Sequence, residues 1–505
     1  MFSSTSQFPF VQISPTPTSY LPAPATDITS YPSPSPAPVD STTSSSVSPV
    51  PEYSSLTSPS AHVPTLRRSQ RQVNVIHEPR TFAEANKHPQ WRATMDKELE
   101  ALENNSTWDL TTLPTGKHAI RSRWVYKVKL HQDGSIERYK ARLVAKGYTQ
   151  VEGVDFFDSF SPVAKTVTVR WFIAIASAYR WPLLQLDVNN AFLHGHLDEE
   201  VYMVPPEGYD KAHGRLICSL KRSLYGLKQA SRQWNIELTS KLESYGFTQS
   251  SHDHCFFTLR KDSFSSIDCD LGNAKYFLGL ELARSAQGTY TFIFGFSRPD
   301  ISFAVQQLSQ FIQHPRQPHW DAALHLVRYL KGTHTLGLFF ASTSSLKLTA
   351  YSDSNWASCL DTRRSVSGYC VFLGDSLVSW KSNKQGTVSR SSAEAEYRSM
   401  GSVVCELLWA RYILGEFGIP LVTPIPFHCD NKDAIHITEN PVFHERIKHL
   451  DIDCHLVRDQ FKQGFILPQH ISSQHQVADL FTKALPATPF SRIVSKLGMF
   501  SHAPT

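Results

Sequence analysis

Four acidic residues in the last third of the chain stand where apolar stretches end or helices begin: Asp353, Glu396, Asp430 and Asp479. Taken singly, an acid in such a place is most often a helix cap or a solvated charge. Four carboxylates gathered in one fold are, however, the ligands that a two-metal nuclease needs. Because carboxylates at close range repel one another, Mg²⁺, or alternatively Mn²⁺, would remove that cost while it activates a water in line with a scissile phosphate. The pattern therefore indicates metal-dependent hydrolysis of a phosphodiester.

The residues around these acids predict the strands and helices that carry them. Apolar runs predict strands at 346–353, 367–372, 377–380, 427–429 and 465–467. Asp353 ends the first of these strands, and Asp430 follows the fourth, where a helix begins. Asp479 is expected on a late helix after the fifth strand.

A long helix is expected to open at Ser391. Ser391 and Glu394 have the spacing of a capping box, in which the glutamate side chain caps the helix. Glu396 lies one turn further in and stays available as a ligand. We therefore assign the metal-binding acid of this helix to Glu396 rather than to Glu394.

A further acid, Asp187, ends the apolar run 183–186, and the aromatic Phe192 follows it. In isolation this is an ordinary strand end. A polymerase palm uses two metal ions to activate the primer hydroxyl and to hold the triphosphate, and one isolated carboxylate cannot position both. No two aspartates are adjacent anywhere in the 505 residues. The chain thus lacks the acidic pair that polymerisation requires.

Upstream of Asp187, two stretches at 122–129 and 139–147 predict paired strands, with Asp133-Gly134 as the turn signal between them. Basic residues alternate with apolar ones in the first stretch, so one face of the hairpin would be cationic. That face is either a solvated strand face or a grip on phosphates or on an incoming triphosphate.

Further motifs follow one another along the chain at 148–150, 160–163, 185–195, 223–230 and 276–281. With them, residues 80–490 resemble the reverse transcriptase and RNase H region of Ty1/copia-type LTR retrotransposon polyproteins. The resemblance implies copying of retroelement RNA into DNA and degradation of the RNA of the hybrid. The partners that it implies are an RNA template, a DNA primer, dNTPs and the RNA/DNA hybrid.

The resemblance also implies roles for individual residues. By it, Asp187 is the first palm metal ligand, and the backbone carbonyl of Val188 adds a contact. Phe192 is the aromatic gate that packs under the sugar and excludes a ribose 2′-hydroxyl. The residues implied to hold nucleotide or template are Lys140 and Arg142 in the fingers, and Gly226, Lys228 and Gln229 beside the templating pair. In the RNase H region, the four metal ligands are Asp353, Glu396, Asp430 and Asp479.

The chain departs from the family pattern in two places. After Ile267 it lacks the Tyr-x-Asp-Asp turn with its flanking strands, and after Gly288 it lacks a long thumb-region segment. Asp268 and Asp270 are not expected to replace the lost pair, because the palm hairpin that would present them is gone as well. Polymerisation is therefore predicted to be absent or severely impaired, while RNA cleavage remains chemically available.

Two alternatives stay open at this point. The chain is a catalytically inactive relic that binds nucleic acid through its basic hairpin, or the two gaps are false splice junctions and the locus encodes an intact polymerase. Hybrid binding without Mg²⁺-dependent cleavage would indicate the first alternative. Genomic DNA read across Ile267 and Gly288 would test the second.

Length and composition bound the remaining choices. A chain of 505 residues can bury two or three cores. Its net charge is only +5, so a nucleic-acid surface would be local rather than global. No run of about 18 apolar residues is present, so we expect a soluble protein without a membrane partner. Eight cysteines without a CxxC pair, and no secretory stretch, predict a cytoplasmic or nuclear protein that is not secreted, and the family resemblance implies a virus-like particle.

We expect an α/β protein with an incomplete right-hand polymerase domain (fingers and palm) followed by an RNase H-like domain. Residues 1–66 carry Asp27, Asp40 and Glu52 as their only charged residues and cannot bury enough apolar surface to offset their ordering entropy. The expected divisions are a disordered Pro/Ser/Thr-rich linker at 1–79, the truncated reverse transcriptase at 80–296, a connection region at 297–345, the RNase H-like domain at 346–490 and a tail at 491–505.

Overall fold

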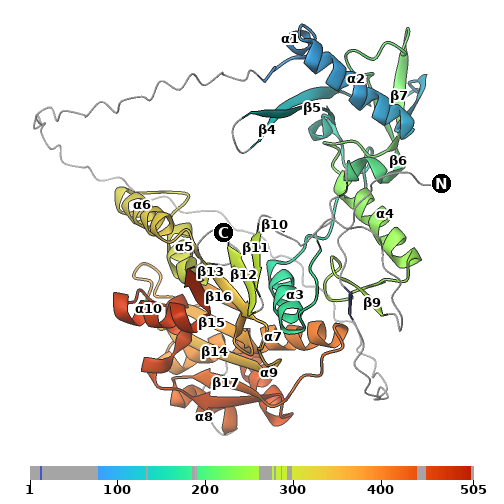
Figure 1. Ribbon diagram of the computed structural model, residues 1–505. Helices are drawn as coiled ribbons and strands as arrows, with labels where there is room; N and C mark the ends of the chain where they lie inside the picture. The colour runs from blue at the N-terminus through green and yellow to red at the C-terminus, as the bar shows by residue number, and fades with distance from the viewer. Residues whose placement is uncertain are drawn as a thin grey trace, which may run out of the picture.

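The structure is a computed structural model that describes residues 12–13, 78–131, 135–184, 188, 190–260, 276–277, 280–285, 287–292, 298–440 and 451–501. Helices and strands alternate along the chain in a mixed α/β architecture, which confirms the predicted fold class. Figure 1 shows most of the blue-to-green elements on one side and the yellow-to-red elements on the other, while α3 (Thr166–Ala178) lies with the second group. Among the described residues, no helix combines the length and apolar character that crossing a bilayer requires.

The predicted hairpin is present as β4 (Ser122–Leu130) and β5 (Ile136–Ala145), which pair antiparallel. Its turn at Asp133-Gly134 lies outside the described residues. One face of the hairpin packs on α2 (Pro89–Asn104), where the ring of Trp91 meets those of Tyr126 and Tyr139 edge to face at 5.3 and 4.9 Å between centroids. The opposite face holds the basic residues, so the prediction of one cationic face is confirmed.

A four-stranded sheet accompanies the hairpin, in the order β2-β7-β6-β3. Its strands are β2 (Trp108–Thr112), β3 (Ala119–Ile120), β6 (His196–Met203) and β7 (Leu216–Arg222). The remaining elements of this part are α1 (Phe82–Ala85), η1 (Gly147–Thr149), η2 (Ala191–His194), α4 (Ala230–Ser244) and a small sheet of β1 (Gln12–Ile13), β9 (Phe257–Arg260) and β8 (Thr248–Gln249). Apart from Gln12 and Ile13, the expected linker up to residue 77 lies outside the described residues.

A five-stranded sheet joins strands that are far apart in the sequence, in the order β10-β11-β12-β13-β19. They are β10 (Tyr276–Phe277), β11 (Leu280–Ser285), β12 (Gly288–Phe292), β13 (Leu336–Ala341) and β19 (Met499–Ser501). The pairing of β12 with β13 crosses the division that we expected at 296/297, and β19 comes from the expected tail. The domain divisions themselves stay predictions.

The other five-stranded sheet has the order β16-β15-β14-β17-β18, and it contains the five strands expected around the acids. They are β14 (Leu348–Asn355), β15 (Val366–Leu373), β16 (Ser376–Lys384), β17 (Ile425–Cys429) and β18 (Ile466–His470). The first three pair antiparallel, whereas β14 pairs parallel with β17 and β17 parallel with β18. The central strand β14 is thus flanked on both sides, which fixes its end at the middle of the sheet.

The long predicted helix is α7 (Ser392–Glu416), with Ser391 as its N-cap. It lies across β14 and β15 and buries one apolar stripe against them. Fully burying a side chain of this kind stabilises the fold by roughly 1.5–3 kcal/mol. Residues of the stripe recur at the three- and four-residue spacing of an amphipathic helix, namely Met400, Val403, Val404, Leu407, Ala410, Ile413 and Leu414.

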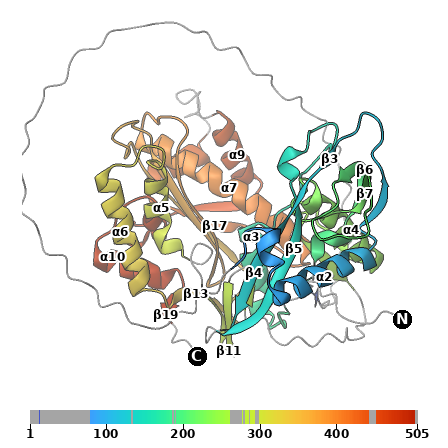
Figure 2. The same cartoon turned by 90° about the horizontal axis from the view of Figure 1, so that it is seen from above.

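Other helices cover the edges of the two larger sheets. In the expected connection region lie η3 (Pro299–Ile301), α5 (Ser302–Ser309) and α6 (Gln317–Gly332). Figure 2 shows α6, α5 and α10 (Ala487–Lys496) near one another, and the ring of Tyr329 on α6 meets that of Phe490 on α10 at 5.9 Å. The remaining helices here are α8 (Lys432–Glu439), α9 (Asp451–Lys462), η6 (Ser473–His475) and η7 (Val477–Phe481).

Candidate functional site

Two parallel strands place the first pair of predicted acids side by side. In the β14–β17 ladder, Tyr351 lies opposite His428, so Asp353 and Asp430 stand two residues further along each strand path and on the same side. Asp353 is buried within β14, and Asp430 is half-buried directly after β17. The strand order of the sheet therefore brings together two acids that are distant in the sequence.

The other two predicted acids reach the same place from helices. Glu396 lies in the first turns of α7 and is 4% exposed, and Asp479 lies on the short 3-10 helix η7. One oxygen each from Asp353, Asp430 and Asp479 lies within 4.8 Å of the others. Glu396, Cys429 and Asp430 form a second group with the same limit. All four predicted acids thus converge, with Asp430 shared by both groups.

Hydrogen bonds hold the carboxylates in place. The backbone N–H of Ser354 donates to Glu396 Oε1 at 2.9 Å, and the hydroxyl of Ser473 donates to Asp430 Oδ2 at 2.8 Å. The hydroxyl of Thr482 donates to Asp353 Oδ2. Each of these bonds fixes one carboxylate oxygen and leaves the orientation of the group defined before any ligand binds.

Burial makes the ionised forms of these acids costly. Burial raises the pKa of Asp353 from 3.8 to about 6, with Lys483 acting in the opposite direction and Asp479 in the same one. The pKa of Glu396 lies well above its usual value because of burial and the neighbouring Asp353 carboxylate. The pKa of Asp479 is raised by burial too. The ionised forms of these neighbouring acids are costly, and a bound cation would stabilise them.

Lys483 is a residue of this site to which the sequence gave no role. Its Nζ lies 2.8 Å from Asp479 Oδ1 and 3.6 Å from Asp353 Oδ2, so it neutralises part of the acidic cluster. The spacing of Asp479 and Lys483, four residues apart, was the available signal. Its contact with Asp353 arises only from the tertiary fold.

The interpretation of Glu394 as a cap is confirmed. Its backbone N–H donates to Ser391 Oγ at 3.2 Å, and its Oε2 accepts from the backbone N–H of Arg390 at 2.7 Å. Its other oxygen, Oε1, lies 3.0 Å from the guanidinium of Arg398. Glu394 is thus used at the helix start, while Glu396 enters the acidic cluster.

The donors of the cluster fit a hard divalent cation. Carboxylate oxygens are the ligands that Mg²⁺ and Mn²⁺ prefer, and Mg²⁺ sites commonly use one or two carboxylates with water completing the shell. Asp430, which belongs to both groups, is half-buried, so water can complete such a shell. The structure therefore contains carboxylates that can hold a divalent metal.

In the polymerase-like region, Asp187 lies outside the described residues, and so do Asp268 and Asp270. Val188 is described and half-buried. Phe192 lies on η2, and its ring meets that of Tyr225 edge to face at 5.5 Å. The predicted set therefore lies only partly within the described residues, and the position of Asp187 relative to Phe192 stays a prediction.

Arg142 on β5 stacks over the same tyrosine. Its guanidinium carbon lies 4.2 Å from the centroid of Tyr225, and it donates to Asn190 Oδ1 at 3.3 Å. Lys140 lies on the same cationic face, opposite Lys127 in the ladder. Burial lowers the pKa of Lys140, and the neighbouring Arg142 lowers it further. Concentrated positive charge without full compensation suits a polyanion.

The other three residues of the set tie the loop at 225–229 to its surroundings. Gly226 has φ +91°, and a Cβ added there would lie 2.2 Å from the carbonyl oxygen of Ala145, so only glycine fits. Gln229 is buried, and its Nε2 donates to the carbonyl of Asp155 at 3.0 Å. Lys228 Nζ donates to the carbonyl of Gln150 at 3.2 Å. These contacts position the loop beside β5.

Comparisons with known proteins relate this chain to a family. Residues 105–267 match the family model described as reverse transcriptase (RNA-dependent DNA polymerase). The chain is 37% identical over 512 residues to the retrovirus-related Pol polyprotein from transposon RE1 of Arabidopsis thaliana, which covers 85% of this chain and 35% of that protein. It is 30% identical over 521 residues to the corresponding polyprotein from transposon TNT 1-94 of Nicotiana tabacum, which covers 84% of this chain and 39% of that protein.

The chain thus spans between 35% and 39% of the length of these relatives. Among solved structures, it is similar to a fusion of the N-terminal RNase H domain of a Mycobacterium tuberculosis protein with maltose-binding protein, at 14% identity and a TM-score of 0.21, with 30% of this chain and 98% of that chain covered. A TM-score this low carries no argument about the fold. The matched polyproteins carry the family relationship instead: this chain is similar to part of the Ty1/copia-type retrotransposon Pol polyproteins, and its residues 105–267 match reverse transcriptase.

Proposed function

We propose that this chain hydrolyses the RNA strand of RNA/DNA hybrids at the site of Asp353, Glu396, Asp430 and Asp479, and that it does not polymerise DNA. The observation that carries the proposal is the convergence of these four acids from a central strand, a long helix, a strand end and a short helix. Four separate elements supply one carboxylate each to a common point. Such convergence suits metal-assisted phosphodiester hydrolysis.

Each side chain has a defined task in this proposal. Asp353, Asp430 and Asp479 would hold a divalent ion, and Glu396 belongs to the second ligand group, which shares Asp430 with the first. A bound divalent ion supplies an activated water and neutralises charge that develops on the phosphate. Lys483 holds Asp353 and Asp479 in place in the absence of such an ion, and the hydroxyl of Thr482 orients Asp353.

The loss of polymerisation rests on the sequence. Without two adjacent aspartates, the region lacks the acids that would hold the second metal beside Asp187. The cationic face of the hairpin, with Lys140 and Arg142, then has the task of holding the phosphate backbone of the hybrid. Use of an RNA template, a DNA primer and dNTPs is a property that we assign to complete relatives rather than to this chain.

The proposal is tested by Mg²⁺-dependent cleavage of the RNA strand in an end-labelled RNA/DNA hybrid. Asp430→Asn removes the shared carboxylate, and Asp433→Asn, at an exposed position of α8, serves as the matched control. We expect cleavage by the unchanged chain and by the control, and loss of at least about 100-fold in Asp430→Asn. Absence of cleavage by folded protein at all Mg²⁺ and Mn²⁺ concentrations would contradict the nuclease function.

A second candidate function is favoured by the cationic face of the hairpin. Side chains of Lys127, Lys140 and Arg142 share that face, and binding of nucleic acid alone requires nothing further. In that case the chain would bind hybrid with salt-dependent affinity and leave its RNA intact. The same labelled hybrid distinguishes the two functions, because binding and cleavage are measured in one sample.

A further inference from the structure

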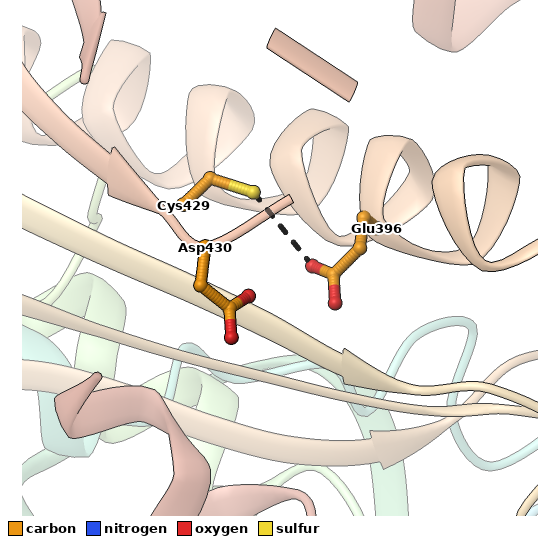
Figure 3. A group of neighbouring side chains, drawn as sticks. All are labelled: Glu396, Cys429 and Asp430. Carbon is orange, nitrogen blue, oxygen red and sulfur yellow. Dashed lines mark hydrogen bonds between the residues drawn. The ribbon is translucent and has the colours of Figure 1, made fainter. Parts of the chain in front are cut away.

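A thiol lies among the carboxylates of the acidic cluster. Cys429 is the last residue of β17 and directly precedes Asp430, and it is fully buried. Figure 3 shows its sulfur directed at the carboxylate of Glu396, with Asp430 beside them. The Sγ–Glu396 Oε2 distance is 3.9 Å. Nuclease chemistry with a hard cation gives this sulfur no task, because Mg²⁺ prefers oxygen ligands.

The geometry of the three groups is close to that of a zinc shell. Zn–S and Zn–O bonds of about 2.3 and 2.0 Å place tetrahedral ligands roughly 3.3–3.5 Å apart. The ligand atoms of Glu396, Cys429 and Asp430 lie within 4.8 Å of one another, and the sulfur–carboxylate pair is already at 3.9 Å. A small side-chain rotation therefore closes the shell, while water can fill the fourth position beside half-buried Asp430.

The two ligand groups around Asp430 differ in chemical softness. Asp353, Asp430 and Asp479 offer oxygen only, whereas the second group exchanges one oxygen for sulfur. Thiolate sulfur selects Zn²⁺ and Cd²⁺ over Mg²⁺. We propose that Glu396, Cys429 and Asp430 form a soft-metal site for Zn²⁺, which overlaps the nuclease site and excludes the catalytic ion when it is filled.

Parts of this site are already held in place. Ser354 fixes Glu396 through Oε1, so Oε2 is the oxygen that faces the sulfur. Ser473 fixes Asp430 through Oδ2. Metal binding displaces the thiol proton, and the proton leaves to solvent as the metal–sulfur bond forms. Little reorganisation is then needed beyond the closing of the three ligands.

The test uses Cd²⁺, whose bond to a thiolate absorbs in the ultraviolet and reports binding without any need for nuclease activity. All cysteines other than the buried Cys218, Cys370 and Cys429 are first replaced, so the background chain carries serine at Cys255, Cys269, Cys359, Cys405 and Cys454. In this background, we expect one equivalent of Cd²⁺ to produce the thiolate absorption. Cys429→Ser should abolish it, and Glu396→Gln should weaken Cd²⁺ binding by at least about tenfold, since even residues that only support a metal ligand usually cost that much.

X-ray absorption of the Zn²⁺-loaded background chain provides a measurement that does not depend on the folding of Cys429→Ser or Glu396→Gln. We expect one sulfur neighbour at about 2.3 Å together with oxygen neighbours near 2.0–2.2 Å. A shell of oxygen or nitrogen alone would overturn the proposal. An absorption unchanged by Cys429→Ser would overturn it as well.

The exclusion of the catalytic ion rests on the proposed nuclease function and is measured separately. Zn²⁺ is titrated into cleavage reactions at fixed Mg²⁺, and inhibition is expressed relative to the activity of each variant in Mg²⁺ alone. We expect inhibition by Zn²⁺ to weaken at least about tenfold in Cys429→Ser. Equal inhibition of both chains would overturn the exclusion, whereas a chain without any cleavage would remove the nuclease proposal and leave the Cd²⁺ result unaffected.

Discussion

The two halves of this protein distribute their acidic residues in opposite ways. In the polymerase-like region, we predicted that the adjacent aspartate pair belongs to a single hairpin that is missing after Ile267, and no two aspartates are adjacent in the chain. In the RNase H-like region, four acids come from four elements that also build the core. On the proposed function, absence of a single short segment is enough to remove the polymerase metal site, whereas deletion of any segment that carries an acid of the nuclease site would also disrupt the core.

The described residues of the polymerase-like region that we predicted to bind nucleotide or template are held by contacts within the protein. Lys228 and Gln229 tie their loop to neighbouring backbone. The guanidinium of Arg142 stacks over the ring of Tyr225, and the ring of Phe192 meets Tyr225 edge to face. These contacts need no metal, so they persist without the acidic pair. Presence of a family's binding residues is thus a weaker indicator of activity than presence of its metal ligands.

Helix α3 (Thr166–Ala178) shows that the two halves are not independent. It packs against β12, β13 and β16, and Arg170 donates to the carbonyl of Val378 at 2.9 Å. The guanidinium of Arg170 also stacks on the ring of Trp380 at 3.8 Å. The residues of α3 belong to the part of the chain that we expected to be polymerase-like, yet this helix packs on the sheets of the other part.

The largest effect is expected at the centre of the acidic cluster. Asp353→Asn removes a predicted metal ligand, and RNA cleavage should fall by at least about 100-fold. The same change should stabilise the metal-free chain at neutral pH by up to roughly 3 kcal/mol, because burial raises the pKa of Asp353 from 3.8 to about 6 and its ionised form is therefore costly. Cleavage assays and urea unfolding measure the two quantities.

The matched control for this change is Asp375→Asn, at an exposed position. It should leave both quantities unchanged within error. If Asp353→Asn lost activity and stability together, the residue would be structural, and the contrast between the two halves would lose its main support.

The second largest effect is expected at the contact between the halves. Arg170→Ala leaves the Val378 carbonyl without its donor and removes the stacking on Trp380, at a combined cost of about 3 kcal/mol. Urea unfolding should show one shared transition for tryptophans of both halves, shifted in the variant. Arg328→Ala, on the exposed side of α6, is the control. Two separate transitions, with only one shifted, would show that the halves fold independently.

A smaller effect is expected in the pH dependence of metal binding. The pKa of Asp353 is raised, so between about pH 4 and pH 6 the folded chain keeps a proton that the unfolded chain releases. Stability of the metal-free chain should therefore fall as pH rises through this window, and Mg²⁺ should restore it above the window. Thermal unfolding with and without Mg²⁺ should show little difference at pH 5 and a rise of a few degrees at pH 8. A rise in Tm that is larger at pH 5 has the wrong sign for a carboxylate site.

The sequence identified the acids of the nuclease half but not their neighbours. Asp353 and Asp430 were recognisable because each follows an apolar strand pattern, although β14 continues past Asp353 to Asn355. Glu396 was recognisable because the capping box assigned Glu394 to another task. Lys483 and Cys429 were not, since their roles depend on distances that only the fold creates. Pairing of β12 with β13 was equally unpredictable, because no local signal records which distant strands become neighbours.

The smallest effect is expected on the cationic face, where the two halves would cooperate. Lys140→Gln should weaken binding of an RNA/DNA hybrid a few-fold and lower the salt dependence of binding by about 0.9 in the log–log slope, the value for one lost phosphate contact. Lys117→Gln, at a residue paired with Glu200, is the control. In cleavage assays, KM should rise while kcat at saturating hybrid stays constant, because in this proposal Lys140 would contact the backbone of the hybrid and not the reacting phosphate. If both the salt dependence of binding and KM stayed unchanged, the polymerase-like region would contribute packing through α3 but would not bind the hybrid through Lys140.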